Sequence, residues 1–459
     1  MRRLGLVAAA AVVALGSWAC DAEAPRSSPL TSTTTTAPTP VPTDPRPKED
    51  PPRPGRGPAP AECTPDSSLS EAAGPVPADL AASLGARLAD PALVDASASA
   101  SVWIEGWGEV AALNPELELL PASNEKIVTG MGALAVLGPD VTLETAVVVD
   151  GAVEGTTLRG NLVVVGGGDP TLATGGPHSL DTLAAQVRTA GVTQVTGALV
   201  VDESRHDTER YAPGWQWWHI PTYAGPLSAF MVDRNLYRDD PDYVEDPALG
   251  NGEELRGALA RQGVTVVGPT VAGPAPRRAA RLAVEASPPV SALVYDMLLR
   301  SDNMTSEQLV REIGLAGRGK GSTPAGTRAA TDALGALCVP LAGTAADGSG
   351  LSRENFRSAR EWRTMLQAAR TQPWFSLFYE SLPVGGVSGT LARRFGGTAA
   401  AGNVRAKTGS IIGGVALSGY VTTAGGRDAI FSVVVNGPSA AAATGVIDEI
   451  VATVAAYPG

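Results

Sequence analysis

Three short segments of the sequence together supply the serine, amide and lysine side chains that acyl transfer can use. In chain order they are Ser123-Asn124-Glu125-Lys126, Ser301-Asp302-Asn303 and Lys407-Thr408-Gly409. Residues three positions apart share one face of a helix, so Lys126 can reach Ser123 within a single turn. Because a serine hydroxyl is a weak nucleophile without a neighbouring base, the first segment predicts a Ser123 nucleophile with Lys126 as its base.

Lysine is rare in this chain, which makes the lysines of these segments conspicuous. The sequence holds four lysines, and two of them, Lys126 and Lys407, lie in the three segments. A lysine acts as a base only when it is partly neutral, and burial beside a second cation lowers its pKa toward that state. Lys407 is the candidate for that second cation. Arginine in place of Lys126 would not serve, because it keeps its proton.

Other catalytic patterns are missing. The three histidines, at positions 178, 206 and 219, do not have the spacing of zinc ligands. The triplet Gly166–Gly168 lacks the pattern of a dinucleotide or phosphate loop, and there is no G-x-S-x-G elbow. A formal net charge of −12 argues against general nucleic-acid binding. We therefore expect a serine enzyme without a metal or cofactor.

The N-terminus reads as an export signal followed by a spacer. Residues 1–20 combine two arginines, an apolar run of twelve residues and a cleavage region, which is typical of a signal peptide. Cleavage after Ala19 would leave Cys20 for lipidation, although Trp18 is bulky for a lipoprotein signal. Residues 21–62 are rich in proline and threonine and are expected to be a disordered linker. The sequence therefore predicts an exported protein of the cell envelope, at the outer face of the cytoplasmic membrane or in the periplasm or cell wall, with any membrane contact made through the N-terminal anchor.

The cysteines number three, Cys20, Cys63 and Cys338. If Cys20 is lipidated or removed, Cys63 and Cys338 remain as a pair in an oxidising compartment, where a disulfide is favoured. Two free thiols are the alternative.

The predicted elements place the three segments in one α/β domain. A hairpin is expected at 100–113, strands at 404–407, 416–422 and 429–435, and helices at 123–137, 291–300, 306–315, 358–371 and 439–455. Residues 142–289 differ, with short valine-rich strands and glycine turns. We therefore predict a discontinuous catalytic domain, residues 63–141 and 290–459, with residues 142–289 inserted as a second domain.

From about Leu119 onward the chain resembles the low-molecular-mass class C penicillin-binding proteins, the D-alanyl-D-alanine carboxypeptidase/endopeptidase group. The similar segments are 121–126, 167–172, 347–353, 389–391 and 404–410. The set SxxK, SDN and KTG is shared by penicillin-binding proteins and class A β-lactamases. The resemblance implies a serine β-lactamase/transpeptidase-like fold, in which helices flank an antiparallel five-stranded sheet, with a β-rich inserted domain.

The resemblance also implies catalytic roles. Ser123 would attack the D-Ala-D-Ala bond of peptidoglycan stem peptides, or of cross-links, and form an acyl-enzyme, and Lys126 would take its proton. Ser301 would relay a proton to the leaving D-alanine, Asn303 would hold the substrate amide, and Lys407 would give electrostatic support. Penicillins and other β-lactams are then expected to acylate Ser123 and inhibit the enzyme.

Substrate-binding residues are implied in the same way. Thr408, Gly409 and Ser410 would line the substrate site, where the Thr408 hydroxyl would bind the terminal carboxylate with Ser410 nearby. The backbone N–H groups of Ser123 and Ser410 would form the oxyanion hole. Arg353 matches a residue that meets the carboxylate of the diaminoacid side chain in some members. His219 stands where family members often carry an acid that meets the side-chain amine, and packing beside the neighbouring tryptophans is its alternative role.

Two other functions compete with this interpretation. A class A β-lactamase would carry a glutamate deacylation base in an ExxLN-like loop, and no such element lies between Asn303 and Lys407. A catalytically silent cell-wall-binding protein could keep the same scaffold, because fold alone does not fix function. The intact Ser123, Lys126 and Lys407 argue for an enzyme.

Overall fold

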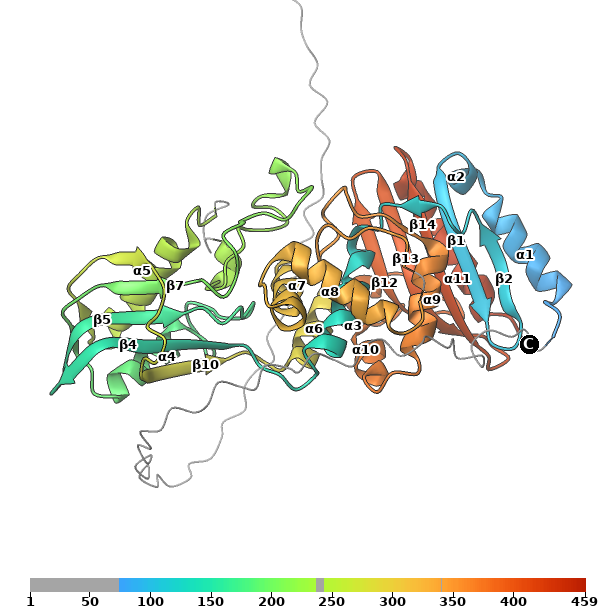
Figure 1. Ribbon diagram of the computed structural model, residues 1–459. Helices are drawn as coiled ribbons and strands as arrows, with labels where there is room; N and C mark the ends of the chain where they lie inside the picture. Colours follow the sequence, from blue (N-terminus) through green and yellow to red (C-terminus); the bar gives the residue numbers. More distant parts are fainter. Residues whose placement is uncertain (1–73, 237–242, 340) are drawn as a thin grey trace, which may run out of the picture. The chain divides into compact units, whose positions relative to one another are not determined.

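The main sheet of the protein combines strands from the N-terminal and the C-terminal part of the described chain. The computed structural model describes residues 74–236, 243–339 and 341–459. Five antiparallel strands follow the order β12-β13-β14-β1-β2 (Figure 1). They are β1 (Ser97–Ile104), β2 (Gly108–Leu113), β12 (Arg405–Ile411), β13 (Gly414–Thr422) and β14 (Asp428–Asn436). The predicted α/β fold with an antiparallel five-stranded sheet is confirmed.

Both faces of this sheet are buried under helices. Along β1, Val102 and Ile104 pack into one core and Trp103 into the other, because alternate residues of a strand point to opposite faces. The core of Val102 is closed by α1 (Ala78–Leu88), α2 (Pro91–Val94) and α11 (Ala443–Ala455). The core of Trp103 is closed by α3 (Glu125–Val136), α6 (Val290–Arg300), α7 (Asn303–Arg318), α8 (Thr323–Gly335), α9 (Ala359–Ala369) and α10 (Phe375–Ser381). A short pair, β3 (Glu118–Leu119) with β11 (Arg357–Ser358), accompanies the main sheet.

A second sheet is built by residues 144–286, which we call the 144–286 region. Its longest strands are β4 (Glu144–Glu154), β5 (Thr157–Val165) and β10 (Arg281–Ala286), which pair antiparallel in the order β10-β4-β5. Four shorter strands add parallel pairs: β6 (Gln194–Val195), β7 (Leu199–Asp202), β8 (Thr265–Val266) and β9 (Thr270–Ala272). Alternate residues of β5, such as Leu162 and Val164, enter this region's own core.

Two helices of the 144–286 region were not expected from its valine-rich sequence. They are α4 (Leu180–Thr189) and α5 (Pro247–Arg261), and both pack into the core of the region. The buried residues of α4 lie at 180, 183, 184 and 187, a helical spacing that the sequence does contain. Among the residues that the structure describes, no helix combines the length and apolar character needed to cross a bilayer.

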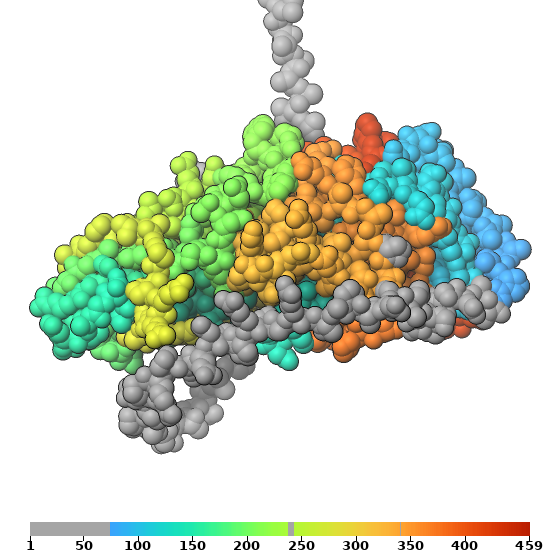
Figure 2. Space-filling model, viewed as in Figure 1, coloured from blue at the N-terminus to red at the C-terminus, as the bar shows by residue number. Residues whose placement is uncertain are grey.

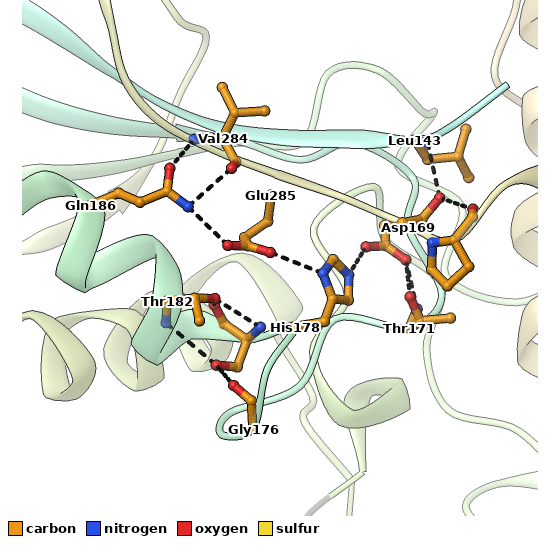
Figure 3. A network of polar contacts seen from close by, with 12 residues as sticks. Leu143, Asp169, Thr171, Gly176, His178, Thr182, Gln186, Val284 and Glu285 are labelled. Carbon is orange, nitrogen blue, oxygen red and sulfur yellow. Dashed lines mark hydrogen bonds and ion pairs between the residues drawn. The ribbon is translucent and has the colours of Figure 1, made fainter. Parts of the chain in front are cut away.

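An ionic network ties the 167–172 segment of this region to α4 and β10 (Figure 3). His178 Nε2 lies 2.6 Å from Asp169 Oδ2, and His178 Nδ1 lies 3.0 Å from Glu285 Oε2. Asp169 also accepts from Thr171, and Glu285 accepts from Gln186. Both ring nitrogens face carboxylates, so the hydrogen bond to Asp169 and then the other contacts raise the pKa of His178 above its ordinary value of 6.5. The imidazolium form is therefore the one that this network stabilises.

We expect His178→Asn to destabilise the protein in a pH-dependent way. A raised pKa in the folded state means that the contribution of His178 is fully present below about pH 6.5 and is lost as pH rises through the folded-state pKa. Hydrogen bonds to charged groups contribute about 1.5–3 kcal/mol, so the loss in free energy of unfolding should be of that order at pH 6 and smaller at pH 9. Urea unfolding at both pH values measures it, and equal losses would contradict the assignment.

Candidate active site

Ser123 lies in a tightly enclosed turn at the start of α3. The 3₁₀ turn η2 (Ala122–Asn124) leads directly into the helix, and Ala122 has a left-handed φ of 48°. Two glycines let neighbouring backbone approach this turn. A Cβ on Gly350 would lie 1.9 Å from the oxygen of Ala122, and one on Gly409 would lie 2.6 Å from that of Pro121. The 347–350 loop and β12 can therefore both close around the turn that carries Ser123.

Lys126 joins two of the three sequence segments at one atom. Its side chain is fully buried, and Nζ lies 3.1 Å from Ser123 Oγ, as expected for residues one turn apart. The same Nζ lies 2.7 Å from Asn303 Oδ1 and 2.5 Å from the carbonyl oxygen of Ser349. Lys126 thus connects the nucleophile with the SDN segment and with the 347–353 segment, in which the sequence assigned a role to Arg353 but not to Ser349.

The environment of Lys126 lowers its pKa, so that part of the side chain is neutral near pH 7, as a base requires. Burial lowers the pKa of Lys126 to about 8, and the charges of Asp347, Glu307 and other nearby acids oppose part of this lowering. The sequence suggested a neighbouring cation as an additional cause, whereas burial is the largest effect here. With a pKa of about 8, roughly a tenth of the side chain is neutral at pH 7.

Ser301 and Lys407 form a second pair in the site. Ser301 ends α6 in the left-handed conformation, with φ 63° and ψ 40°, and this turns its hydroxyl toward Lys407. Lys407 Nζ lies 3.0 Å from Ser301 Oγ and 2.9 Å from the carbonyl oxygen of Thr408. Burial, and then the charge of Lys126, lower the pKa of Lys407 well below its ordinary value. Its two hydrogen-bonding partners are neutral oxygens, so no ion pair among these contacts stabilises the charged form of Lys407.

Glu307 supports the site from α7 and was missed in the sequence. It lies one turn after Asn303, on the same face of the helix, a spacing that could have drawn attention to it. Its Oε1 accepts hydrogen bonds from the backbone N–H groups of Gly348 and Ser349, at 3.1 and 2.8 Å. Burial raises the pKa of Glu307 to about 8. The carboxyl therefore fixes the loop whose Ser349 carbonyl contacts Lys126.

Thr408 and Ser410 of β12 line a pocket, whereas Lys407 of the same strand contacts Ser301. The pocket has a volume of about 350 Å³, and its lining includes Thr390, Arg394, Thr408, Gly409 and Ser410. Thr408 Oγ1 donates to Thr390 Oγ1 at 2.7 Å. Thr390 belongs to the 389–391 segment noted in the sequence, but only the structure identifies its hydroxyl as a neighbour of Thr408. Thr408 and Thr390 thus present hydroxyls, which suit a carboxylate, whereas the Arg394 guanidinium is already paired with Asp448.

Arg353 and His219 lie outside this cluster of contacts. Arg353 is exposed and donates to the carbonyl oxygen of Ile412 at 3.1 Å. His219 is only 3% exposed, and its Nδ1 accepts from the backbone N–H of Gln216 at 3.2 Å. Burial lowers the pKa of His219 below its ordinary value of 6.5, so the ring is neutral at pH 7. These surroundings favour the packing role of His219, and its contact with substrate stays a prediction.

Cys338 is the one cysteine within the described residues. Cys338 is disulfide-bonded, whereas Cys20 and Cys63 lie outside the described residues, so the pairing of Cys63 with Cys338 stays a prediction. Within the described part of the chain, no group of three or more histidine, cysteine, aspartate or glutamate side chains has the arrangement of a metal site.

The chain is similar to known carboxypeptidases over most of its length. It matches the D-Ala-D-Ala carboxypeptidase 3 (S13) family over residues 80–240 and 242–457. It is 32% identical to a D-alanyl-D-alanine carboxypeptidase of Actinomadura sp. (strain R39), over 85% of this chain and 87% of that protein. A carboxypeptidase of Mycobacterium tuberculosis is 34% identical, over 80% of this chain and 81% of that protein.

Solved structures agree with this relationship at the level of the fold. The structure of penicillin binding protein 4 from Haemophilus influenzae matches with a TM-score of 0.71 and 24% identity, covering 78% of this chain and 93% of that one. The family match spans nearly all of the described residues, and the relatives are aligned over most of their length. The chain therefore belongs to the D-Ala-D-Ala carboxypeptidase 3 (S13) family and is a serine D,D-peptidase of the class C penicillin-binding type.

Proposed function

We propose that Ser123 carries out this hydrolysis on the stem peptides of peptidoglycan, with Lys126 as its base. The observation that supports it most is the position of Lys126 Nζ, within 3.1 Å of Ser123 Oγ and 2.7 Å of Asn303 Oδ1. Ser123 Oγ attacks the carbonyl carbon of the penultimate D-alanine and passes its proton to Lys126. The C–N bond then breaks, and the leaving amine takes, through Ser301, the proton that Lys126 received. A water molecule next attacks the ester carbonyl and gives a proton to Lys126, the C–Oγ bond breaks, and Ser123 Oγ takes that proton as the shortened peptide leaves with a new carboxyl group.

The carboxylate of the substrate would act on the protonation state of Lys407. Thr408, with Thr390 at 2.7 Å, offers hydroxyls to the terminal carboxylate of the stem peptide. An anion bound there favours the charged form of Lys407, whose pKa is well below its ordinary value in the free protein. The backbone N–H groups of Ser123 and Ser410 act as the oxyanion hole, in which one donor is typically worth about 2.7–4 kcal/mol.

β-Lactams are the expected inhibitors, because they present an acylating carbonyl beside a carboxylate. The penicillin binding protein 4 of Haemophilus influenzae has been solved in complex with a β-lactam, and its fold matches this chain with a TM-score of 0.65. The same serine that attacks D-Ala-D-Ala would be acylated in this chain.

This chemistry would take place outside the cytoplasm, where peptidoglycan lies. Residues 1–20 would direct export, Cys20 would carry a lipid, and residues 21–62 would be a tether to the membrane surface. The catalytic domain would comprise residues 63–141 and 290–459, with residues 142–289 as an inserted domain. The assignments of residues 1–62 rest on the sequence alone, since residues 1–73 lie outside the described part of the chain. The domain bounds are those expected from the sequence.

Penicillin should form a stable adduct on Ser123. Ser123→Ala should lose the adduct and keep its thermal unfolding transition, because Ser123 is only partly buried and alanine fits the same helical start. Intact-protein and peptide mass spectrometry of wild type and variant measure both. An adduct on Ser301, or no adduct in the wild type, would refute the nucleophile assignment.

The rate of acylation should rise with pH through an apparent pKa of about 8. The neutral form of Lys126 is the reactive one, and it increases as pH passes the pKa to which burial lowers this side chain. Lys126→Arg should therefore lose acylation at all pH values up to 9, since a guanidinium keeps its proton. Stopped-flow measurement with a chromogenic cephalosporin gives the profile.

Lys407→Arg is the matched control, because it makes the same change at the other buried lysine of the site. If Lys407 acts through its charge, this variant should keep measurable acylation where Lys126→Arg does not. Equal losses in both variants would contradict the division of roles.

A further inference from the structure

A stretch of the 144–286 region, Pro213–Leu236, contacts both of the segments that hold Lys126, the SDN segment at the start of α7 and the 347–350 loop. We propose that this 213–236 segment is a positioning element of the active site, so that chemistry at Ser123 depends on the 144–286 region. The inference rests on the proposed roles of Ser123 and Lys126. Figure 2 shows the green surface of this part of the chain against the orange surface of residues that follow position 300.

The first contact fixes the SDN segment through Asp302. Arg234 Nη2 lies 2.6 Å from Asp302 Oδ2, while Asp302 Oδ1 accepts from the backbone N–H of Thr305 at 2.7 Å and caps α7. The side chain of Asp302 is 7% exposed and that of Arg234 is 48% exposed. Both oxygens of Asp302 are thereby committed, one to its own helix and one to the 213–236 segment. Arg234 therefore anchors the residue that precedes Asn303.

The second contact sets the orientation of the Asn303 amide. Asn303 Nδ2 donates to the carbonyl oxygen of Tyr223 at 2.9 Å, and Asn303 Oδ1 faces Lys126 Nζ at 2.7 Å. An amide with its oxygen and nitrogen reversed would turn an acceptor toward the Tyr223 carbonyl and lose that bond. One N–H of the amide is used by Tyr223, which leaves the other for a ligand.

The third contact reaches the loop that provides the Ser349 carbonyl. Trp215 Nε1 donates to Asp347 Oδ2 at 2.9 Å, and Asp347 Oδ1 accepts from the backbone N–H of Gly350 at 2.8 Å. An apolar cluster lies between the two loops: Ala224, Leu227, Met231 and Met304, with Trp215, Ile220 and Leu351 packed against it. The 213–236 segment therefore braces both Asn303 and Ser349, the two partners of Lys126 that are distant from it in sequence.

The segment is itself held in an unusual conformation. Asp233, Arg234 and Asn235 have φ values of 45°, 63° and 56°, in the left-handed region that non-glycine residues rarely adopt. Asn235 is fully buried, donates to the Pro226 carbonyl at 2.6 Å and accepts from Asn251 Nδ2 at 2.7 Å. Such conformations cost energy and persist where surrounding contacts impose them. Here the result is that Arg234 points at Asp302.

Arg234→Ala tests the first contact. We expect the second-order rate constant of penicillin acylation to fall about tenfold, since small displacements of catalytic groups have large kinetic effects. For a D-Ala-D-Ala peptide, kcat should fall with little change in KM, and Arg234→Lys should recover part of the rate. Arg159→Ala is the matched control, because Arg159 forms an exposed pair with Glu154 in the same region and should leave the rate at the wild-type value.

Trp215→Phe tests the loop contact independently, because it removes the N–H donor and keeps most of the ring. It should also slow acylation severalfold, whereas Trp217→Phe, at a side chain that is 83% exposed, should not. The fraction of protein that penicillin finally labels should stay near one in both test variants. Wild-type rates in both would overturn the positioning role, as would a loss of labelled fraction at unchanged rate, which indicates partial unfolding only. If penicillin fails to label wild-type protein, the proposed function falls, and the positioning role with it.

Discussion

The site depends on the burial of one amine, Lys126 Nζ, in the protein interior. A fully buried lysine is unfavourable in its charged form, and four acids around it, Asp347, Glu307, Asp302 and Glu125, oppose that penalty. The atoms that Nζ contacts are nevertheless neutral oxygens, of a hydroxyl, an amide and a carbonyl. The acids therefore act from a distance, which is enough to keep the pKa near 8 and too little to lock the proton in place. A direct ion pair would raise the pKa further and remove the base.

Two of the acids around Lys126 have raised pKa values because they are buried themselves. Burial raises the pKa of Glu307 to about 8 and that of Glu125 to about 7, so each is only partly charged at neutral pH and offsets the burial of Lys126 only in part. Glu125 pairs with buried Arg357, which also pairs with Glu361 of α9. This pairing ties the first turn of α3 to a neighbouring helix. Removing one partner of such a buried network typically costs about 3–5 kcal/mol, so the turn that carries Ser123 is held by more than its own helix.

The sequence predicted the parts of the site that are defined by local spacing or by side-chain type. Ser123 and Lys126 are one helical turn apart, and this relation follows from their positions in the chain alone. The five strands were expected from their residues and bounding turns, whereas their assembly into one antiparallel sheet was implied by the family resemblance. The carbonyl oxygens of Ser349 and Tyr223 could not be predicted, because every residue has one and only the fold selects which are used. The left-handed backbone at Arg234 is likewise imposed by tertiary contacts, and nothing in its residue type indicates it.

The two lysines of the site show why residue type alone does not assign a role. Lys126 lies among acids, whereas the main influences on the pKa of Lys407 are burial and the charge of Lys126, both of which disfavour its proton. A substrate that brings a carboxylate to Thr408 changes this balance mainly at Lys407, whose Nζ already contacts the Thr408 carbonyl. Charging Lys407 in turn disfavours the charge on Lys126, since the two buried cations repel. If Lys126 and Lys407 have the proposed roles, the substrate helps to form the base that activates Ser123, because the neutral form of Lys126 becomes more populated when a carboxylate-bearing peptide is bound.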